Sequence, residues 1–395
     1  MRSILAFWLG LLSYSAESDP WVAMSERASG QVVYFNAWGG SPSINAYIRR
    51  WSDAAFDQYG INVRHVKVDD ISPAITSIHT AKLMGQKTNG PVDLVWINGE
   101  NFARMKRDGL LGPAFVEFLP NAFGLDLKDI SNLLDFSIPT DGLEAPWGRA
   151  RLVFVHDSLK LSKPPKTLIE LVAYARAHPG RVTYPEPPNF HGTTFLKQVL
   201  LETTRHPDWL SEPYDPARFE EATMGVWSLL DQLNSVAWRS GREFPDSAEE
   251  MMELFADGVL DIAFTFNPND ASARILDGRF LESVRTYVHR GGTIGNTHFL
   301  AIPFNAKARD GALIFINLLL SAKAQADKAD PNIWGDPTVL NLDRLSLEDR
   351  SYFDMVGGPA TLTQAELGPS LPEPHASWTE PLEAAWLNRY VGSKR

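Results

Sequence analysis

Strands alternate with helices along the first hundred residues, and this order limits the folds that the chain can adopt. Segments typical of strands lie at residues 32–35, 61–68 and 92–97, the second with apolar residues alternating with polar or charged ones, and amphipathic helices follow the first two. Strand–helix–strand connections build parallel sheets, and the loops after the strands meet at one edge, where ligands bind. We therefore expect an α/β domain with a binding edge formed by these loops.

A second α/β unit follows, from an apolar strand at residues 152–155 to a buried strand at 260–266, with a short strand at 181–184 between them. The two units are connected near residues 145–155 and again near 290–303. Two connections between two lobes form a hinge. The predicted fold is a two-lobed α/β protein, with lobe 1 at 16–150, lobe 2 at 151–292, and a return to lobe 1 with C-terminal helices at 293–395.

The first fifteen residues are typical of a signal peptide. Arg2 supplies a positive charge, residues 4–12 are apolar, and small residues precede a cleavage site expected after Ser15. The apolar segment is far shorter than the roughly 20 residues that span a membrane. The alternative is a buried N-terminal strand or helix of the mature fold. The signal-peptide interpretation predicts export and removal of residues 1–15.

The chain has no cysteine among its 395 residues and a formal net charge of -11. It can therefore form neither disulfides nor thiolate metal sites, and it cannot carry a lipid on an N-terminal cysteine. The negative charge argues against general binding to nucleic acid or to anionic membranes. We expect a protein that is free in the periplasm, stabilised by its hydrophobic core, with no metal and no cofactor.

Sequence features that match one family are spread over most of the chain after residue 15. They are Trp38-Gly39-Gly40, Ala145-Pro146-Trp147-Gly148, the block from Ala248 to Phe266, and the segment from Leu319 to Pro337. Together they resemble the family 1 extracellular solute-binding proteins of ABC importers, most closely their YnjB-like branch. The resemblance implies a type II-like periplasmic binding protein that closes on one small solute and delivers it to a membrane permease. We expect this protein to be a monomer and not an enzyme.

Loops after the strands supply the candidate solute contacts if the two lobes face each other. Glycine allows close approach of the backbone, and a helix amino end offers free N–H groups to an anionic group. A Gly-Ser or Gly-Thr sequence before a helix is also ordinary capping, and Thr193 and Thr194 are expected to cap the helix that ends at Leu201. The candidates are Trp38, Gly39, Gly40, Ser41, Asn98, Glu100, Trp147, Tyr184, Phe190, Thr193, Thr194, Asn267, Asn269 and Asp270.

Aromatic and acidic candidates favour a cationic or aromatic organic solute such as thiamine. Trp38 and Trp147 can stack on a ring or hold a cation, although both can equally belong to the core. Glu100 and Asp270 can pair with a cation, or simply interact with a helix dipole. The glycine and hydroxyl segments also allow an anionic group. Ferric iron is disfavoured because the chain has no adjacent pair of tyrosines.

Two other classes of function remain open. An exported hydrolase is one of them, but the sequence has no Gly-x-Ser-x-Gly, Ser-x-x-Lys or His-Glu-x-x-His motif. A pair of carboxylates that cleaves saccharides needs no such motif, because any two acidic residues can converge in a fold. The other class is a solute sensor that uses the same fold to dock a receptor.

Overall fold

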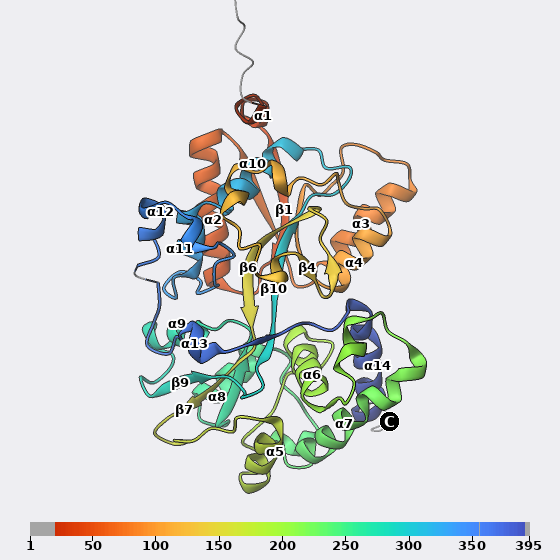
Figure 1. Ribbon diagram of the computed structural model, residues 1–395, viewed down its shortest axis with the longest axis vertical. Coiled ribbons are helices and arrows are strands. Elements are labelled where there is room, and N and C mark those ends of the chain that lie inside the picture. Colours follow the sequence, from red (N-terminus) through yellow and green to blue (C-terminus); the bar gives the residue numbers. More distant parts are fainter. Residues whose placement is uncertain (1–19, 355, 392–395) are drawn as a thin grey trace, which may run out of the picture.

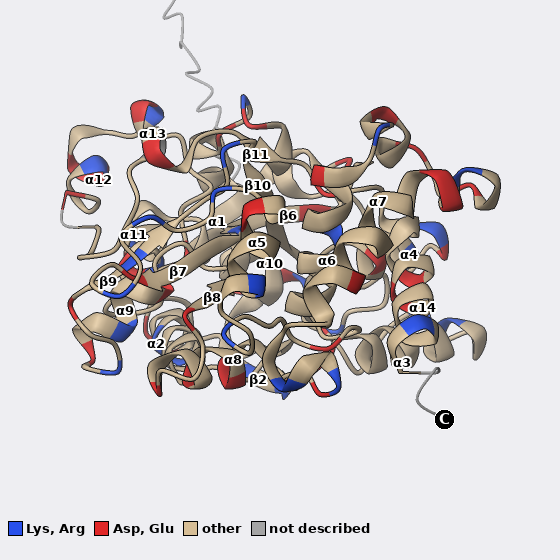
Figure 2. Ribbon diagram, turned by 90° about the horizontal axis from the view of Figure 1, so that it is seen from below, with Lys and Arg blue, Asp and Glu red and all other residues tan. Residues whose placement is uncertain are grey.

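Two lobes, one above the other in Figure 1, make up the computed structural model, which describes residues 20–354 and 356–391. The expected signal peptide lies outside the described residues. Among those described, no helix has the length and apolar character needed to cross a membrane. Positions of Lys and Arg are interspersed with positions of Asp and Glu when the molecule is seen from below (Figure 2).

The sheet of the first lobe has the strand order β11-β10-β3-β1-β2, and β6 also pairs with β10. β1 runs parallel to β2 and to β3, as the strand–helix–strand order predicts. β10 runs antiparallel to β3 because the chain returns here from the second lobe. The strands are β1 (Val32–Trp38), β2 (Asn62–Val68), β3 (Leu94–Ile97), β6 (Glu144–Arg151), β10 (Thr293–Ala301) and β11 (Ser370–Leu371).

Helices cover this sheet, and α10 is buried from Gly311 to Leu319. A two-stranded hairpin and short 3-10 helices complete the lobe. The elements are α1 (Pro20–Ala28), α2 (Pro42–Tyr59), α3 (Ser72–Leu83), α4 (Glu100–Arg107), η1 (Val116–Phe118), η2 (Pro120–Gly124), η3 (Ile130–Asn132), β4 (Leu134–Asp135), β5 (Ile138–Pro139), α10 (Arg309–Leu319), α11 (Ala322–Ala329), η6 (Leu342–Arg344) and α12 (Leu347–Ser351).

The second lobe has a smaller antiparallel sheet with the order β8-β7-β9. The strand expected at 181–184 is reduced to a single bridge between Val182 and Ile262, because Pro185 follows at once and has no N–H to donate. The elements are β7 (Val153–Asp157), α5 (Leu168–Ala177), α6 (Phe190–Thr203), η4 (Pro207–Ser211), α7 (Pro216–Asn234), η5 (Trp238–Gly241), α8 (Ala248–Ala256), β8 (Ile262–Thr265), α9 (Asp270–Leu276) and β9 (Val284–Tyr287).

The lobes are joined where β6 leads into β7 and where β9 leads into β10. A C-terminal segment also crosses, because β11 pairs with β10 at Thr293 and Ile294. Arg151 ties these segments together: its backbone N–H donates to Phe266 at 3.1 Å, and its guanidinium donates to the Thr293 hydroxyl at 2.9 Å and to the Leu367 carbonyl at 3.0 Å. The hinge predicted from two connections is therefore reinforced by the C-terminal segment.

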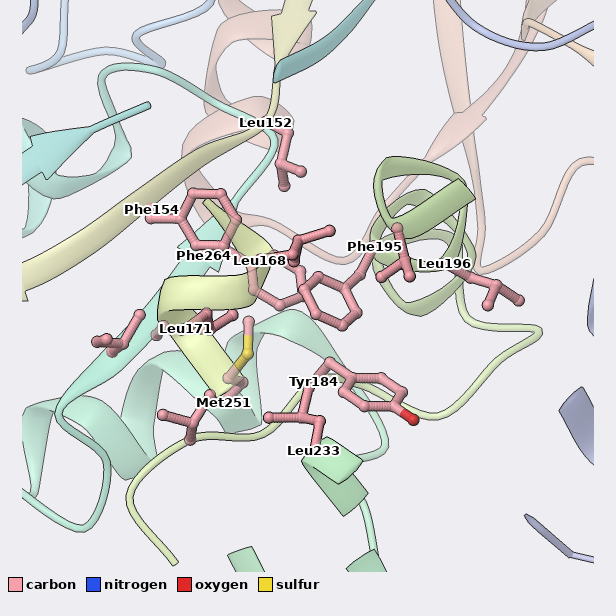
Figure 3. Close-up of a cluster of buried hydrophobic side chains, with 14 of the residues drawn as sticks. Leu152, Phe154, Leu168, Leu171, Tyr184, Phe195, Leu196, Leu233, Met251 and Phe264 are labelled. Carbon is pink, nitrogen blue, oxygen red and sulfur yellow. The ribbon is translucent and has the colours of Figure 1, made fainter. Parts of the chain in front are cut away.

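The C-terminal helix packs on the second lobe. After α13 (Gln364–Leu367), β11 and η7 (Ala376–Trp378), the chain ends in α14 (Thr379–Tyr390), drawn in dark blue beside α6 and α7 in Figure 1. Leu382 and Trp386 of α14 belong to the same buried cluster as Phe154 and Phe264 of the small sheet. Figure 3 shows part of this cluster.

Candidate functional site

Helix α6 begins earlier than Thr193 and Thr194 predict. Asn189 is its N-cap, and its side-chain oxygen accepts from the N–H of His191 at 3.0 Å. Thr193 and Thr194 lie inside the helix and are buried. Only glycine fits at position 192 in the first turn, because a Cβ there would lie 2.2 Å from the carbonyl oxygen of Pro185. The threonines are therefore not capping residues, since asparagine already fills that role.

A buried ion pair lies where α6 meets the C-terminal segment. The ammonium of Lys197 is 3.3 Å from the Glu373 carboxylate, and both side chains are almost completely buried. Asn296 of β10 donates from its amide to the other oxygen of Glu373 at 2.8 Å. The amide oxygen of Asn296 is buried and has no hydrogen-bond partner. A buried acceptor without a partner costs free energy unless a ligand or water satisfies it.

A strained hairpin of the first lobe lies next to Lys197 and Glu373. The β4–β5 turn is formed by Phe136 and Ser137, with φ angles of 42° and 66°, a conformation that normally selects asparagine or glycine. The ring of Phe136 lies 4.2 Å from the Lys197 ammonium, and the hydroxyl of Ser137 donates to the carbonyl of Glu373 at 3.1 Å. Backbone strain of this kind tends to occur at ligand clamps and other functional sites.

Carboxylates collect around Lys197. Asp135 accepts from the N–H of Gly99 with both oxygens, each at 2.8 Å. Glu383 of α14 accepts from the hydroxyl of Thr193 at 2.6 Å, and Glu100 is the exposed first residue of α4.

Burial raises the pKa of Asp135, Glu373 and Glu383, and the nearby charge of Glu100 raises each of them further. Within the described part of the chain, the acidic side chains Glu100, Asp135, Glu373 and Glu383 lie close together, and the charge of Lys197 acts on the last three. We call these residues the inter-lobe carboxylate cluster.

The loop after β1 is accessible. Trp38 exposes 41% of its surface, and a Cβ on Gly40 would lie 2.5 Å from its ring. A Cβ on Gly39 would lie 2.6 Å from Lys67. Ser41 caps α2, as expected, by accepting from Ile44. This loop therefore presents an aromatic face at the carboxyl edge of the sheet.

Two aromatic candidates lie in the core instead. Trp147 is fully buried within β6 and packs against Trp96 and Trp334, with ring centroids 4.9 Å and 5.3 Å away. Tyr184 is also fully buried (Figure 3) and accepts from the indole N–H of Trp386 at 3.0 Å. In this conformation neither ring has surface left for a solute. Trp147 looked like a loop residue because Pro146 and Gly148 flank it.

The remaining candidates are either partly exposed or already paired within the protein. Asn98 and Phe190 are partly exposed at the end of β3 and the start of α6. Asn267 and Asn269 donate to backbone carbonyls of the first lobe, at Trp334 and Gly335. Asp270 pairs with Arg274 one turn along α9, at 3.0 Å.

Sequence reasoning missed most of the carboxylate cluster. Asp135, Lys197, Glu373 and Glu383 lie far from the strand ends that guided the search, in a hairpin, inside a helix and in the C-terminal segment. Phe136 before Ser137 gave no turn signal, because the pair is neither Asn-Gly nor Asp-Gly. Trp96 was also missed, although it is half-buried and lies two residues before Asn98. The one local sign of this cluster in the sequence was Lys197, a charged residue among the apolar residues of α6.

Known proteins share both the sequence and the fold. The model of the bacterial extracellular solute-binding protein family matches residues 53–341. Protein YnjB of Escherichia coli strain K12 is 41% identical over 382 residues, which cover 97% of each chain. The chain belongs to the bacterial extracellular solute-binding proteins. As a member of this family it is an extracellular solute-binding protein.

Solved structures of other solute-binding proteins have the same two-lobed fold. The TpPotD lipoprotein of Treponema pallidum is 14% identical, with a TM-score of 0.65 over 91% of this chain and 99% of that chain. The periplasmic binding protein AfuA of Actinobacillus pleuropneumoniae, bound to fructose-6-phosphate, is 13% identical, with a TM-score of 0.63 over 92% and 99%. At these identities the likeness supports the fold and leaves the solute open.

Proposed function

We propose that this solute-binding protein captures a cationic, aromatic organic solute of the thiamine type at the inter-lobe carboxylate cluster. The observation that carries the proposal is the excess of carboxylates around Lys197. Burial is the main cause of each raised carboxyl pKa, the charge of Glu100 adds to it, and a cationic group beside these carboxyls would favour their charged forms. Glu100, Glu373 and Glu383 are the proposed partners of that group.

Aromatic side chains of β1 and β3 in the first lobe supply the second part of the recognition. Trp96 is half-buried next to His298, with ring centroids 5.0 Å apart, and Trp38 is exposed at the end of β1. An aromatic face attracts a cation and stacks on a flat ring, which contributes about 0.5–2 kcal/mol depending on desolvation. A solute that carries both charge and ring uses both features.

The remaining expectations follow from this role. The protein binds without turnover, is free in the periplasm after loss of residues 1–15, and docks as a monomer on an inner-membrane permease. Binding energy shared between the two lobes favours the closed conformation, and the permease distinguishes the closed protein from the open one.

A thermal-shift screen of residues 16–395 tests the solute class. The library contains organic cations with and without a ring, neutral sugars and organic anions. A solute present at 100 times its Kd adds about 2.7 kcal/mol of stability. We expect shifts with aromatic cations. A shift with sugars or anions alone would contradict the proposal.

Isosteric variants test the site. Glu383→Gln keeps the shape of the side chain and its acceptor for Thr193 but removes its charge, so we expect weaker binding of the cation by roughly tenfold. Glu348→Gln, on the exposed surface of α12, is the matched control and should bind as the wild type does. Equal Kd values for all three proteins would exclude Glu383 from the site.

A further inference from the structure

Two asparagine side chains connect the lobes next to the hinge. Asn267 donates to the carbonyl of Trp334 at 3.1 Å, and Asn269 donates to the carbonyl of Gly335 at 2.7 Å. Both asparagines follow β8, whose neighbour Phe266 belongs to the core of the second lobe. Trp334 belongs to the core of the first lobe. These bonds therefore join two cores that a hinge motion moves relative to each other.

The accepting loop is held rigidly by a buried ion pair. Lys328 and Asp336 contact each other through their charged groups, with side chains at most 5% exposed. The carboxylate of Asp336 also lies 3.1 Å from Nε2 of His298. The N–H groups of Gly335 and Asp336 donate to the carbonyl of Lys328 at 3.0 Å and 2.8 Å. The carbonyls of the loop are therefore held in place by contacts within the first lobe.

The donating amides are oriented as well. The amide oxygen of Asn267 accepts from the N–H of Asn269 at 2.9 Å. The amide oxygen of Asn269 accepts from the hydroxyl of Thr361 at 2.8 Å. Asn269 is 6% exposed. With the amide oxygens occupied and the N–H groups given to the first lobe, these side chains have little capacity left for a solute.

Gly335 lets the two surfaces approach closely. Its φ angle is 88°, and a Cβ at this position would lie 2.9 Å from the Cβ of Asn269. Real Cβ atoms essentially never approach so closely, so any side chain here would push the lobes apart. Glycine is therefore required by the contact as well as by the backbone conformation.

We propose that Asn267 and Asn269 are positioning residues that hold the lobes in the closed arrangement, and that they act on the solute through this equilibrium and not by touching it. The inference rests on capture of a solute by lobe closure, but not on the identity of the solute. A hydrogen bond present only in the closed state shifts the open–closed equilibrium by roughly two- to tenfold. The apparent affinity falls as the closed, binding-competent fraction falls.

The test measures the conformation of the solute-free protein. Because the chain has no cysteine, Leu347→Cys and Leu281→Cys place one spin label on each lobe at positions 88% and 64% exposed. Double electron–electron resonance then reports the distance between the lobes. We expect Asn269→Ala and Gly335→Ala each to move population from the short to the long distance, by roughly two- to tenfold in the ratio.

Matched controls separate closure from strain and from direct binding. Gly278→Ala imposes a similar backbone strain, with φ of 78°, but meets no atom within 4 Å, so it should leave the distances unchanged. The effects of Asn269→Ala and Gly335→Ala should be less than additive, because each breaks the same contact. Unchanged distances in both variants would overturn the proposal, whatever happens to solute binding. Loss of binding in Asn269→Ala without a change in distance would instead make Asn269 a solute ligand.

Discussion

Gly148 shows how closely single residues are constrained in the first lobe. It lies in β6 next to the buried side chains of Lys328, Asp336 and His298. A Cβ there would lie 1.9 Å from a carboxylate oxygen of Asp336, 2.2 Å from Nε2 of His298 and 2.6 Å from Nζ of Lys328. Burial of these charges is tolerated because they contact one another, so a methyl group that separates them leaves charge buried and uncompensated.

We expect Gly148→Ala to lower the free energy of unfolding by about 3–5 kcal/mol, the cost of breaking a buried ion pair. Urea denaturation followed by circular dichroism measures the loss. Gly291→Ala is the control, because its Cβ would meet no atom within 4 Å, and it should change stability by less than about 0.5 kcal/mol. A Gly148→Ala protein as stable as the control would show that the ionic cluster shifts freely.

Single residues also show where the sequence was sufficient. Ser41 was expected to cap a helix, and it does, because the signal for a cap is local. Thr193 and Thr194 carried the same local signal, yet Asn189 takes the cap four residues before Thr193. Trp147 is a core residue because Trp96 and Trp334, both far from it in sequence, pack against its ring. Reasoning from neighbours in sequence cannot reach such contacts.

At the level of elements, α14 links the fold to the proposed site. Trp386 anchors it by donating to Tyr184 and by packing against Phe244, with ring centroids 5.1 Å apart. The helix carries Glu383 into the carboxylate cluster. Its other end is held by Arg389, whose Nε donates to Asp231 at 2.9 Å. A helix expected only from its apolar pattern therefore positions a proposed ligand residue.

We expect Trp386→Ala to cost about 3–5 kcal/mol, because a fully buried indole is replaced by a cavity. Binding of the solute should weaken as well, since Glu383 loses its support. Thermal unfolding and equilibrium binding measure the two effects. Leu159→Ala, at a position 85% exposed, should leave both unchanged. Full affinity in a destabilised Trp386→Ala protein would separate α14 from the site.

The sequence predicted C-terminal helices within residues 293–395 but could not show which lobe the last of them covers. Its docking depends on β11, which is two residues long and pairs with β10 next to Arg151. A strand so short has no periodic signal to detect. The strands β1 and β3 were predicted because each is a nearly continuous apolar segment, and β2 because apolar residues alternate there with polar or charged ones.

For the whole molecule, the carboxylate cluster predicts how stability depends on pH. The folded-state pKa values of Asp135, Glu373 and Glu383 are raised. Groups with a raised folded-state pKa bind more protons in the folded state, so their stabilisation is complete below the unfolded pKa of about 4 and is lost as pH rises through the folded pKa. Carboxyls with a lowered pKa, such as Asp231, act in the opposite sense at lower pH.

We therefore expect the solute-free Glu383→Gln protein to gain stability relative to the wild type as the pH rises from about 4 towards neutral. Denaturation curves at several pH values measure this difference. A saturating cationic solute should reverse it, because the wild type then gains a compensating charge. A difference that is constant over this pH range would show that Glu383 titrates as it does in the unfolded chain.

Proton release on binding tests the proposed recognition most directly. A cation bound by carboxylates of raised pKa lowers those pKa values and so must expel protons. Calorimetric titration with an aromatic cation near pH 6, repeated in buffers with different enthalpies of ionisation, measures the number of protons released. We expect net release, reduced in Glu383→Gln. Saturable binding with no proton release, or with proton uptake, would contradict recognition of a cation by the carboxylate cluster.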